Sequence, residues 1–302
     1  MLLRLADPER RLAAVRLCCD LPLARTAFAR AGGEWRLALP RLPVARLEYE
    51  LEVTGGDGRA RRVPDPAEPR RAGARSVRLL PGYRPPAWLG EDGVLGSRDG
   101  AVWSPAGADP DEPLPLLVAH DGPEYDRAAR LTHYAAAAIR AGRLPRHRVA
   151  LLAARDRNEA YSASADYADA LAREVLPALP PGPRVGMGAS LGALAMLHAE
   201  HQHPGTFRAL FLQSGSYFTP RHDGHEVRFA RYERIVAFVE AVRAIDVPAA
   251  LTCGAPEENV HNNRLMARRL GVALHETPDL HNFTNWRDAL EPHLTRLLAR
   301  VW

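Results

Sequence analysis

A serine flanked by two glycines is the residue of this sequence best suited to do chemistry. Residues 188–192 read GASLG, the pattern Gly-x-Ser-x-Gly, in which a sharp turn between a strand and a helix exposes a serine hydroxyl. The strand-like run RVGMG precedes the turn and the small-residue run LGALAML follows it. We therefore predict that Ser190 is a nucleophile. The alternative is a serine that only caps the helix.

A serine hydroxyl is a weak nucleophile and needs a histidine base, with an acid to orient that base. In this arrangement the three follow in the order serine, acid, histidine. His281 lies between the last strand-like run, VALHETP, and the final helix-like run, so we predict that it is the base. His275 falls inside the strand pattern and His293 inside the helix pattern, which favours structural roles for both.

The acid is expected after the preceding strand-like run, PAALTCG. Glu257 and Glu258 are the only carboxylates there, and we predict that Glu257 orients the base. The alternative is that both carboxylates stabilise the start of the following helix.

Ester hydrolysis also needs two backbone N–H groups that bind the developing oxyanion. One comes from the residue after the nucleophile, which is Leu191. The second is expected from the loop after an early strand, LLVAHDG, where Asp121 and Gly122 follow the strand.

Residues 91–302 are predicted to form the domain that positions these side chains. Short apolar runs (PLPLLVAH, HRVALLAA, PRVGMG, FRALFLQSG, PAALTCG and VALHETP) alternate with segments that have helical spacing, the pattern of a mostly parallel sheet covered on both faces. The sequence therefore predicts a doubly wound α/β fold. No metal or organic cofactor is expected for such a site.

Residues 1–90 show a different pattern. LAAVRLCCD, EWRLALPRL and ARLEYELEV alternate apolar and polar positions between glycine-rich turns, which predicts a small β-sandwich. The Pro-rich bridge from VPDPAEP to Gly90 is expected to run extended. Tyr83 and Trp88 are expected to dock it through their large apolar surfaces.

Composition restricts the class of protein. The chain has 302 residues, 46% of them hydrophobic and 25% charged, which is typical of globular domains. It has no apolar run long enough to cross a membrane, and charges interrupt its first twelve residues where a signal peptide needs an apolar core. Cys18, Cys19 and Cys253 form no disulfide framework. We expect a cytoplasmic protein that binds no membrane.

All forty basic residues other than histidine are arginine, and the formal net charge is +4. The excess lies in residues 1–90, which have 17 arginines against 10 acidic residues, whereas the rest has 23 against 26. No basic run with interleaved aromatic residues is present, so nucleic-acid binding is not expected. Coding bias is the simpler explanation of the arginine content.

Several motifs in this order resemble the enterochelin (enterobactin) esterase family of α/β-hydrolases. They are the Asp-Gly after the first core strand, RNEAYSASADYADALAREVLPAL, GASLG, LQSGSYF, Gly-x-x-Glu at 254–257, and a histidine followed shortly by Trp286. The resemblance covers nearly the whole chain and implies that residues 1–90 form an immunoglobulin-like module. It also implies that the substrate is a small-molecule ester such as a ferric siderophore.

Carried over by position, the resemblance gives Ser190, His281, Glu257 and Leu191 the roles described above. Arg155, after the strand HRVALLAA, corresponds to a region in which an arginine faces the anionic siderophore, and Asp121 is expected to line the same site. The alternative for Arg155 is a surface ion pair with Asp156 or Glu159.

This chain departs from the family pattern around the base and the oxyanion site. The family usually has Gly-Gly-His-Asp where residues 279–282 read DLHN, so the turn before His281 must be made differently. Asn282 lacks the negative charge of the usual aspartate, a difference expected to affect which substrate is used more than hydrolysis itself. Pro123 follows Gly122 and has no N–H, so either Gly122 donates or the oxyanion site is weaker.

Two histidine groups offer other chemistry. His198, His201 and His203 with Glu200 lack the order of a zinc peptidase motif, and a solvated helix end is the expected explanation. His222 and His225 lie in a predicted loop that could contact substrate, although a plain surface loop is the simpler explanation.

The sequence therefore predicts a serine esterase that forms an acyl-enzyme. One alternative is a feruloyl or acetyl carbohydrate esterase, which the lack of a secretion signal disfavours. The other is a non-catalytic binding protein on the same fold, which Pro123 and the altered histidine loop permit.

Overall fold

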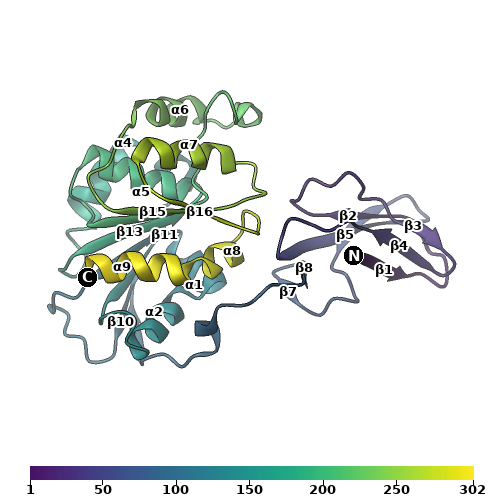
Figure 1. Ribbon diagram of the computed structural model, residues 1–302, viewed down its shortest axis with the longest axis horizontal. Coiled ribbons are helices and arrows are strands. Elements are labelled where there is room, and N and C mark those ends of the chain that lie inside the picture. Colours follow the sequence, from purple (N-terminus) through teal and green to yellow (C-terminus); the bar gives the residue numbers. More distant parts are fainter. The chain divides into compact units, whose positions relative to one another are not determined.

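The computed structural model describes all 302 residues, and its contacts divide the chain into two units. The first unit contains Met1–Arg84 and the three residues Pro278–Leu280, and the second contains Pro85–Thr277 and His281–Trp302. Figure 1 gives the labels of the elements.

The first unit consists of two antiparallel sheets that share one core. A three-stranded sheet has the order β1-β4-β3, and the other has the order β2-β5-β8-β7 with β6 paired to β5. The strands are β1 (Leu2–Ala6), β2 (Leu12–Cys18), β3 (Ala29–Ala31), β4 (Glu34–Ala38), β5 (Arg46–Gly55), β6 (Ala60–Val63), β7 (Arg71–Ala72) and β8 (Arg75–Leu79).

Strand β5 shows why these residues form sheets. Its buried and less buried positions alternate, because successive side chains of a strand point to opposite faces. Leu47, Tyr49 and Leu51 are almost completely buried and join side chains of both sheets in one cluster. Leu280, from the distant segment Pro278–Leu280, is part of this cluster.

The extended bridge predicted from residue 63 to Gly90 contributes a strand to the sheet, which was not expected. Strand β8 pairs with β5 over four residues, from Arg46 opposite Leu79 to Tyr49 opposite Ser76. The prolines lie outside this strand, where they cost no ladder hydrogen bonds. Further along, Trp88 is completely buried as expected, in the short helix η1 (Ala87–Gly90), whereas Tyr83 is half-buried.

The second unit is built on an eight-stranded sheet. Its order is β16-β15-β14-β13-β11-β12-β10-β9, parallel from β16 to β12 and antiparallel at β10 and β9. The strands are β9 (Gly96–Asp99), β10 (Val102–Pro105), β11 (Leu116–His120), β12 (Arg148–Leu152), β13 (Arg184–Ala189), β14 (Ala209–Gln213), β15 (Ala249–Gly254) and β16 (Leu274–Thr277). The predicted mixed α/β fold with a mostly parallel sheet is confirmed, and the hairpin β9–β10 was not foreseen.

Helices cover both faces of this sheet (Figure 1). They are α1 (Gly122–Ala129), α2 (Leu131–Arg140), α3 (Arg157–Ala160), α4 (Ala165–Ala170), η2 (Leu171–Val175), α5 (Leu191–Gln202), η3 (Gly224–Glu226), α6 (Tyr232–Ala241), α7 (Val260–Leu270), α8 (Phe283–Asp288), η4 (Leu290–Leu294) and α9 (Thr295–Val301). None of the helices is long and apolar enough to cross a membrane.

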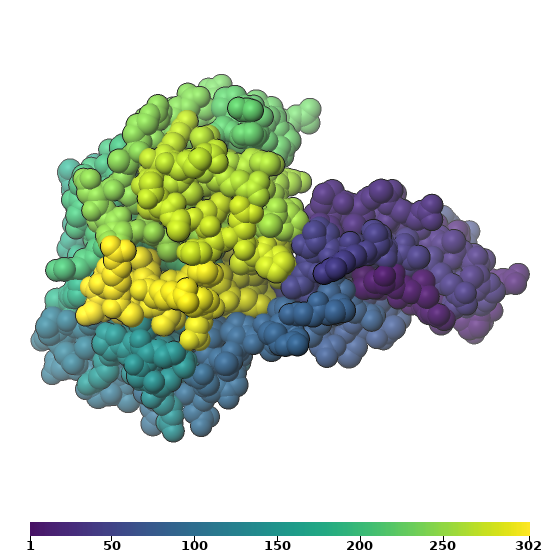
Figure 2. Space-filling model, viewed as in Figure 1, coloured from purple at the N-terminus to yellow at the C-terminus, as the bar shows by residue number.

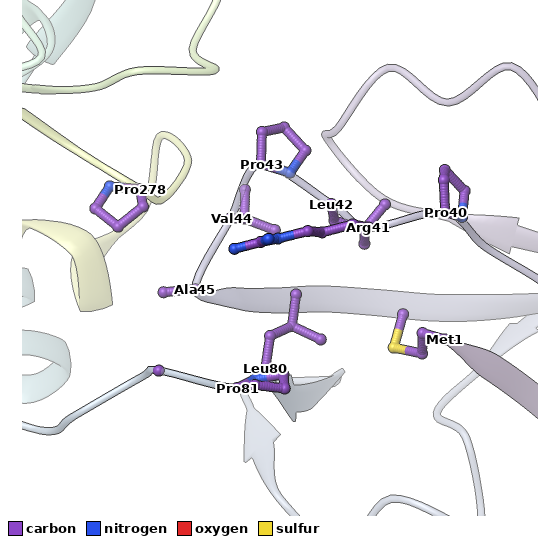
Figure 3. A pocket seen from close by; sticks show the side chains of 11 residues that line it. Met1, Pro40, Arg41, Leu42, Pro43, Val44, Ala45, Leu80, Pro81 and Pro278 are labelled. Atoms are coloured by element: carbon purple, nitrogen blue, oxygen red, sulfur yellow. The ribbon is translucent and has the colours of Figure 1, made fainter.

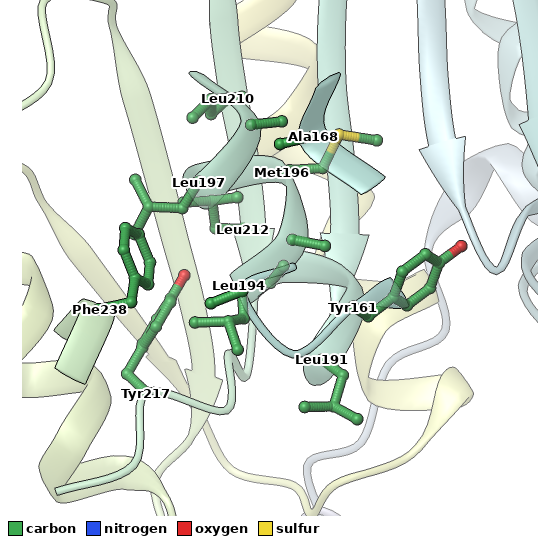
Figure 4. Packing of buried hydrophobic residues seen from close by; sticks show 14 of the residues in the cluster. Tyr161, Ala168, Leu191, Leu194, Met196, Leu197, Leu210, Leu212, Tyr217 and Phe238 are labelled. Atoms are coloured by element: carbon green, nitrogen blue, oxygen red, sulfur yellow. The ribbon is translucent and has the colours of Figure 1, made fainter. Parts of the chain in front are cut away.

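Alternate residues of the parallel strands supply the two cores. In β11, Leu116 and Val118 belong to one cluster, with residues of α4 to α7, and Leu117 and Ala119 to the other, with residues of α1, α2 and α9. Figure 4 shows the first cluster around α5. On the face shown in Figure 2, the yellow C-terminal segment lies beside the teal segment that contains α2.

The active-site candidates all follow the carboxyl ends of parallel strands. Ser190 follows β13, Asp121 follows β11, Glu257 follows β15 and His281 follows β16. Ligands of open α/β sheets bind at this edge, so the topology gathers residues that are 160 positions apart in the sequence.

Candidate active site

Ser190 occupies a strained turn between β13 and α5. Its φ and ψ are 57° and −126°, a region that residues other than glycine rarely adopt. The turn is held by hydrogen bonds that Ser190 N–H donates to Gln213 O at 2.9 Å and that Ser216 N–H donates to Ser190 O at 3.2 Å. The neighbouring strand β14 and the segment after it therefore fix the serine backbone.

The glycines of the turn are required by close backbone contacts. A Cβ on Gly188 would lie 2.5 Å from the Gly192 backbone, and one on Gly192 would lie 3.2 Å from His120 Cβ. The first distance is too short for any side chain, so the turn can form only with a glycine at position 188.

The loop after β11 lies beside the serine turn. Strands β11 and β13 pair in parallel, with Ala119 opposite Met187, so the residues after both strands emerge together. A Cβ on Gly192 would also lie 3.4 Å from Asp121 Oδ2. Asp121 itself has a left-handed backbone, with φ of 50°, and precedes the first residue of α1, Gly122.

Two backbone N–H groups begin helices at this edge of the sheet. Leu191 is the first residue of α5 and Gly122 the first of α1, and neither N–H donates to a protein acceptor. Free N–H groups at helix N-termini favour anions. Pro123 is the second residue of α1, a position where a missing N–H costs nothing.

His281 and Glu257 are joined by a hydrogen bond. His281 Nδ1 lies 2.8 Å from Glu257 Oε2, and the Glu257 side chain is completely buried while that of His281 is 38% exposed. Because a carboxylate oxygen accepts, Nδ1 must carry the proton, which leaves Nε2 free to accept one. Glu258 does not share this position, since its side chain is 79% exposed and contacts His225.

The second oxygen of Glu257 is held by three donors. Gly254 N–H donates to Oε1 at 2.7 Å, Ser214 Oγ at 2.8 Å and Asn285 Nδ2 at 3.2 Å. Trp286 Nε1 in turn donates to Ser214 Oγ at 3.1 Å. These donors fix the position of the Glu257 carboxylate, which suits an acid that orients a histidine.

The hydroxyl of Ser190 contacts another serine. Its Oγ lies 3.2 Å from Ser216 Oγ, and His281 is not within hydrogen-bonding distance of it. In enzymes without substrate such contacts are often long and shorten in the complex. Sequence reasoning missed Ser216, although its motif, LQSGSYF, is one of those that carry the resemblance.

Asp121 is paired with an arginine that sequence reasoning also missed. Arg157 Nε lies 2.8 Å from Asp121 Oδ1 and Arg157 Nη2 lies 2.8 Å from Oδ2, a two-pronged pair. This pair joins the turn after β11 to the start of α3. Arg155 is exposed and forms no ion pair, and Glu159 pairs instead with Arg231 and Arg234. The alternative ion-pair explanation for Arg155 is thus wrong.

His120, at the end of β11, is completely buried behind the serine turn. Its Nδ1 lies 3.1 Å from Gly192 O and its Nε2 lies 2.8 Å from Tyr167 Oη, and its ring stacks on Tyr161 at 4.4 Å. Burial lowers the pKa of His120 to about 4, so the ring is neutral near pH 7. A proton on Nδ1 then satisfies the Gly192 carbonyl, and Nε2 accepts from Tyr167.

The histidine cluster at the end of α5 is not simply a solvated helix end. His198 and Glu200 are buried. Glu200 accepts from the N–H groups of Gly205 and Phe207 at 2.8 and 2.9 Å, and the His198 ring packs edge-on against Phe238 at 4.8 Å. Glu200 therefore closes the turn after α5, and His198 packs against α6.

The loop predicted over the site contains η3. His222 stacks with His261 at 5.4 Å, and His225 lies 3.3 Å from Glu258. His222 is half-buried and His225 exposed.

The mostly parallel sheet, its two helical layers and the serine at a strand-to-helix turn define the α/β-hydrolase class. The model of the family described as putative esterase matches residues 96–297. The chain therefore belongs to the putative esterase family, and the predicted resemblance to enterochelin esterases is confirmed.

Solved structures of enterobactin esterases have the same fold over the whole chain. The enterobactin esterase from Shigella flexneri, crystallised in the presence of enterobactin, has a TM-score of 0.76 at 19% identity, covering 100% of this chain and 93% of that one. The ferric enterobactin esterase from Salmonella typhimurium has a TM-score of 0.74 at 19% identity, covering 99% and 93%.

A feruloyl esterase module from Clostridium thermocellum is similar over a smaller part. Its TM-score is 0.51 at 12% identity, with 72% of this chain and 93% of that chain covered. No curated protein sequence matched this chain.

Proposed function

We propose that this esterase hydrolyses carboxylic esters through an acyl-enzyme on Ser190, with His281 as base and Glu257 as the acid that orients it. The observation that carries the proposal is the bond between His281 Nδ1 and the buried Glu257 carboxylate, at 2.8 Å. This bond fixes the tautomer in which Nε2 can take a proton from serine.

In the first half-reaction Ser190 Oγ attacks the ester carbonyl carbon while His281 Nε2 takes the hydroxyl proton. The carbonyl π electrons move to oxygen, and the N–H groups of Leu191 and Gly122 bind the oxyanion. Collapse breaks the bond to the alcohol oxygen, which receives the proton from His281. Water then repeats the sequence on the acyl-enzyme, releasing the acid and restoring Ser190.

The substrate class we propose is an aromatic ester that carries negative charge, such as a siderophore ester. The relatives were crystallised in the presence of enterobactin, 2,3-dihydroxy-N-benzoyl-glycine and 2,3-dihydroxy-N-benzoyl-serine. Arg155 supports this class, because it is an exposed, unpaired cation beyond the carboxyl end of β12. We also assign the first unit, with its two antiparallel sheets, to the immunoglobulin-like modules.

The test is turnover of 4-nitrophenyl esters by the full-length chain, with labelling by a serine-directed phosphonate. We expect release of nitrophenol, a covalent adduct on Ser190 and no turnover by Ser190→Ala. A wild-type protein that neither turns over nor forms the adduct would instead be a binding protein. Faster turnover of feruloyl esters than of 2,3-dihydroxybenzoyl esters would assign it to the feruloyl esterases.

A further inference from the structure

The three residues before His281 belong to the first unit, although His281 belongs to the second. Pro278, Asp279 and Leu280 follow β16 directly and lead into the candidate base. At this position the family pattern has two glycines before the histidine. Glycines have no side chain that could make such contacts, whereas this chain has Asp279 and Leu280.

Asp279 forms a buried ion pair with Arg46 of β5. Asp279 Oδ2 lies 3.0 Å from Arg46 Nε and 2.8 Å from Nη2. The side chains are 8% and 1% exposed, and Glu48 also pairs with Arg46. Burial opposes the charge of Arg46, but Asp279 and Glu48 outweigh it and raise the arginine pKa. A buried pair of this kind is costly to break from one side.

Two further contacts hold the same segment. Ala45 N–H donates to Pro278 O at 2.6 Å, and Leu280 is 4% exposed within the core cluster of the first unit. Pro278 also forms part of the wall of a pocket of about 910 Å³ in the first unit, with Pro43, Val44 and Ala45 beside it (Figure 3). Backbone, ion pair and apolar side chain therefore anchor three consecutive residues.

Only Leu280 separates the anchored Asp279 from His281. Asp279 Oδ1 accepts from Leu280 N–H at 2.7 Å, which folds the carboxylate over its own backbone. On the other side of His281, the Asn282 side chain caps α8 by accepting from Asn285 N–H at 2.9 Å. The His281 backbone is thus restrained on both sides, and its ring packs edge-on against Trp286 at 5.0 Å.

From these contacts we propose that Arg46 and Asp279 are positioning residues for the base, which restrain the backbone that leads into His281 and so keep its ring bonded to Glu257. The proposal rests on the proposed function of His281. Neither residue touches the reacting atoms, and each acts through the backbone of residues 279–281. The observation that carries this proposal is the buried Arg46–Asp279 pair two residues from the base.

The test compares four variants of the full-length protein in 4-nitrophenyl ester hydrolysis. Asp279→Asn and Arg46→Met remove one charge of the pair, and Arg46→Lys keeps it. Tyr49→Phe is the matched control. Tyr49, in the same strand β5, donates through Oη to Asp65 Oδ2 at 2.5 Å, both residues are buried, and neither is hydrogen-bonded to residues 278–280.

Asp279→Asn and Arg46→Met should lower kcat by about 10- to 100-fold, because a small displacement of a catalytic group has an effect of that size. KM should stay within about threefold, since no substrate contact is lost. Arg46→Lys should recover part of kcat. Tyr49→Phe should lower the melting temperature yet leave kcat within about twofold.

Equal kcat values for Asp279→Asn and Tyr49→Phe, measured well below both melting temperatures, would overturn the proposal. If Arg46→Met does not fold, Asp279→Asn decides, because it keeps the side-chain shape. If the wild type has no turnover and no adduct, the proposed function fails on its own. The positioning is then read from the proton resonance of His281 Nδ1–H, which Asp279→Asn should broaden or shift and Tyr49→Phe should not.

Discussion

His281 Nδ1 and Glu257 Oε2 lie 2.8 Å apart, with the carboxylate completely buried and the imidazole partly open to solvent. One ring nitrogen, Nδ1, is thereby bonded to the protein, and the other, Nε2, is left for the reaction. We expect Glu257→Gln to lower kcat about 1,000-fold or more in the 4-nitrophenyl ester assay, because the amide can stabilise the wrong tautomer and cannot stabilise the imidazolium.

The neighbouring glutamate supplies the control for this experiment. Glu258→Gln removes the same charge one residue away, from a side chain that is 79% exposed. It should leave kcat within about twofold. Equal losses in both variants would show that Glu257 has no special part in catalysis.

Arg155 predicts a difference between charged and neutral substrates. Arg155→Gln should raise KM for a carboxylate-bearing phenyl ester about tenfold, the loss expected for one charge-assisted contact, and leave KM for a neutral ester unchanged. Arg173→Gln is the control, because Arg173 is an exposed arginine of η2, away from the strand ends. Equal KM changes for both esters would remove Arg155 from the substrate site.

Gly188→Ala should destabilise the fold. The added Cβ would lie 2.5 Å from backbone atoms of Gly192, so the strand or the helix must shift, at a cost of about 2 kcal/mol. Gly224→Ala is the control, because no atom lies within 4 Å of its Cβ position. Urea unfolding measures both. An unchanged midpoint for Gly188→Ala would mean that the turn is not as tight as described.

Much of this site could be predicted from the sequence because its signals are local. The strand run RVGMG, the glycines around Ser190 and the order serine, acid, histidine are all readable along the chain. The sequence offers both Glu257 and Glu258 as the acid, and only Glu257 is buried and bonded to the histidine. Adjacent residues point in different directions, so a choice between neighbours depends on the turn after β15.

The residues that were missed depend on contacts between distant segments. Arg155 and Arg157 both follow β12, and the conformation of that loop decides that Arg157 reaches Asp121. Strand β8 is flanked by prolines that indicate a linker, yet pairing with β5 overrides that signal. No local pattern indicates that Asp279 pairs with an arginine 233 positions away.

Acid should destabilise the protein through His120. Burial lowers its pKa from 6.5 to about 4, so the folded state binds this proton less readily than the unfolded state does. The stabilising contribution is therefore complete above pH 6.5 and is lost as the pH falls from 6.5 towards 4. Between pH 7 and pH 5 this one group should lower the free energy of unfolding by roughly 2 kcal/mol.

The measurement is urea unfolding at pH 7 and pH 5 for wild type and His120→Gln. The glutamine keeps a polar side chain but does not titrate, so the variant should show a smaller difference between the two pH values. Buried His147 shares the same direction of pKa shift and remains in both proteins. Identical pH dependence in the two proteins would exclude His120 as the source.

The presence of Pro278–Leu280 in the first unit limits where the chain can be divided. The polypeptide passes from one unit to the other after Arg84, again after Thr277 and again after Leu280. A single cut at residue 85 therefore leaves neither unit complete. The N-terminal fragment lacks Leu280, which belongs to its core, and the C-terminal fragment contains Asp279 without its partner Arg46. A chimaera that replaces residues 1–84 with those of a relative would also need the three matching residues of that relative directly before the histidine.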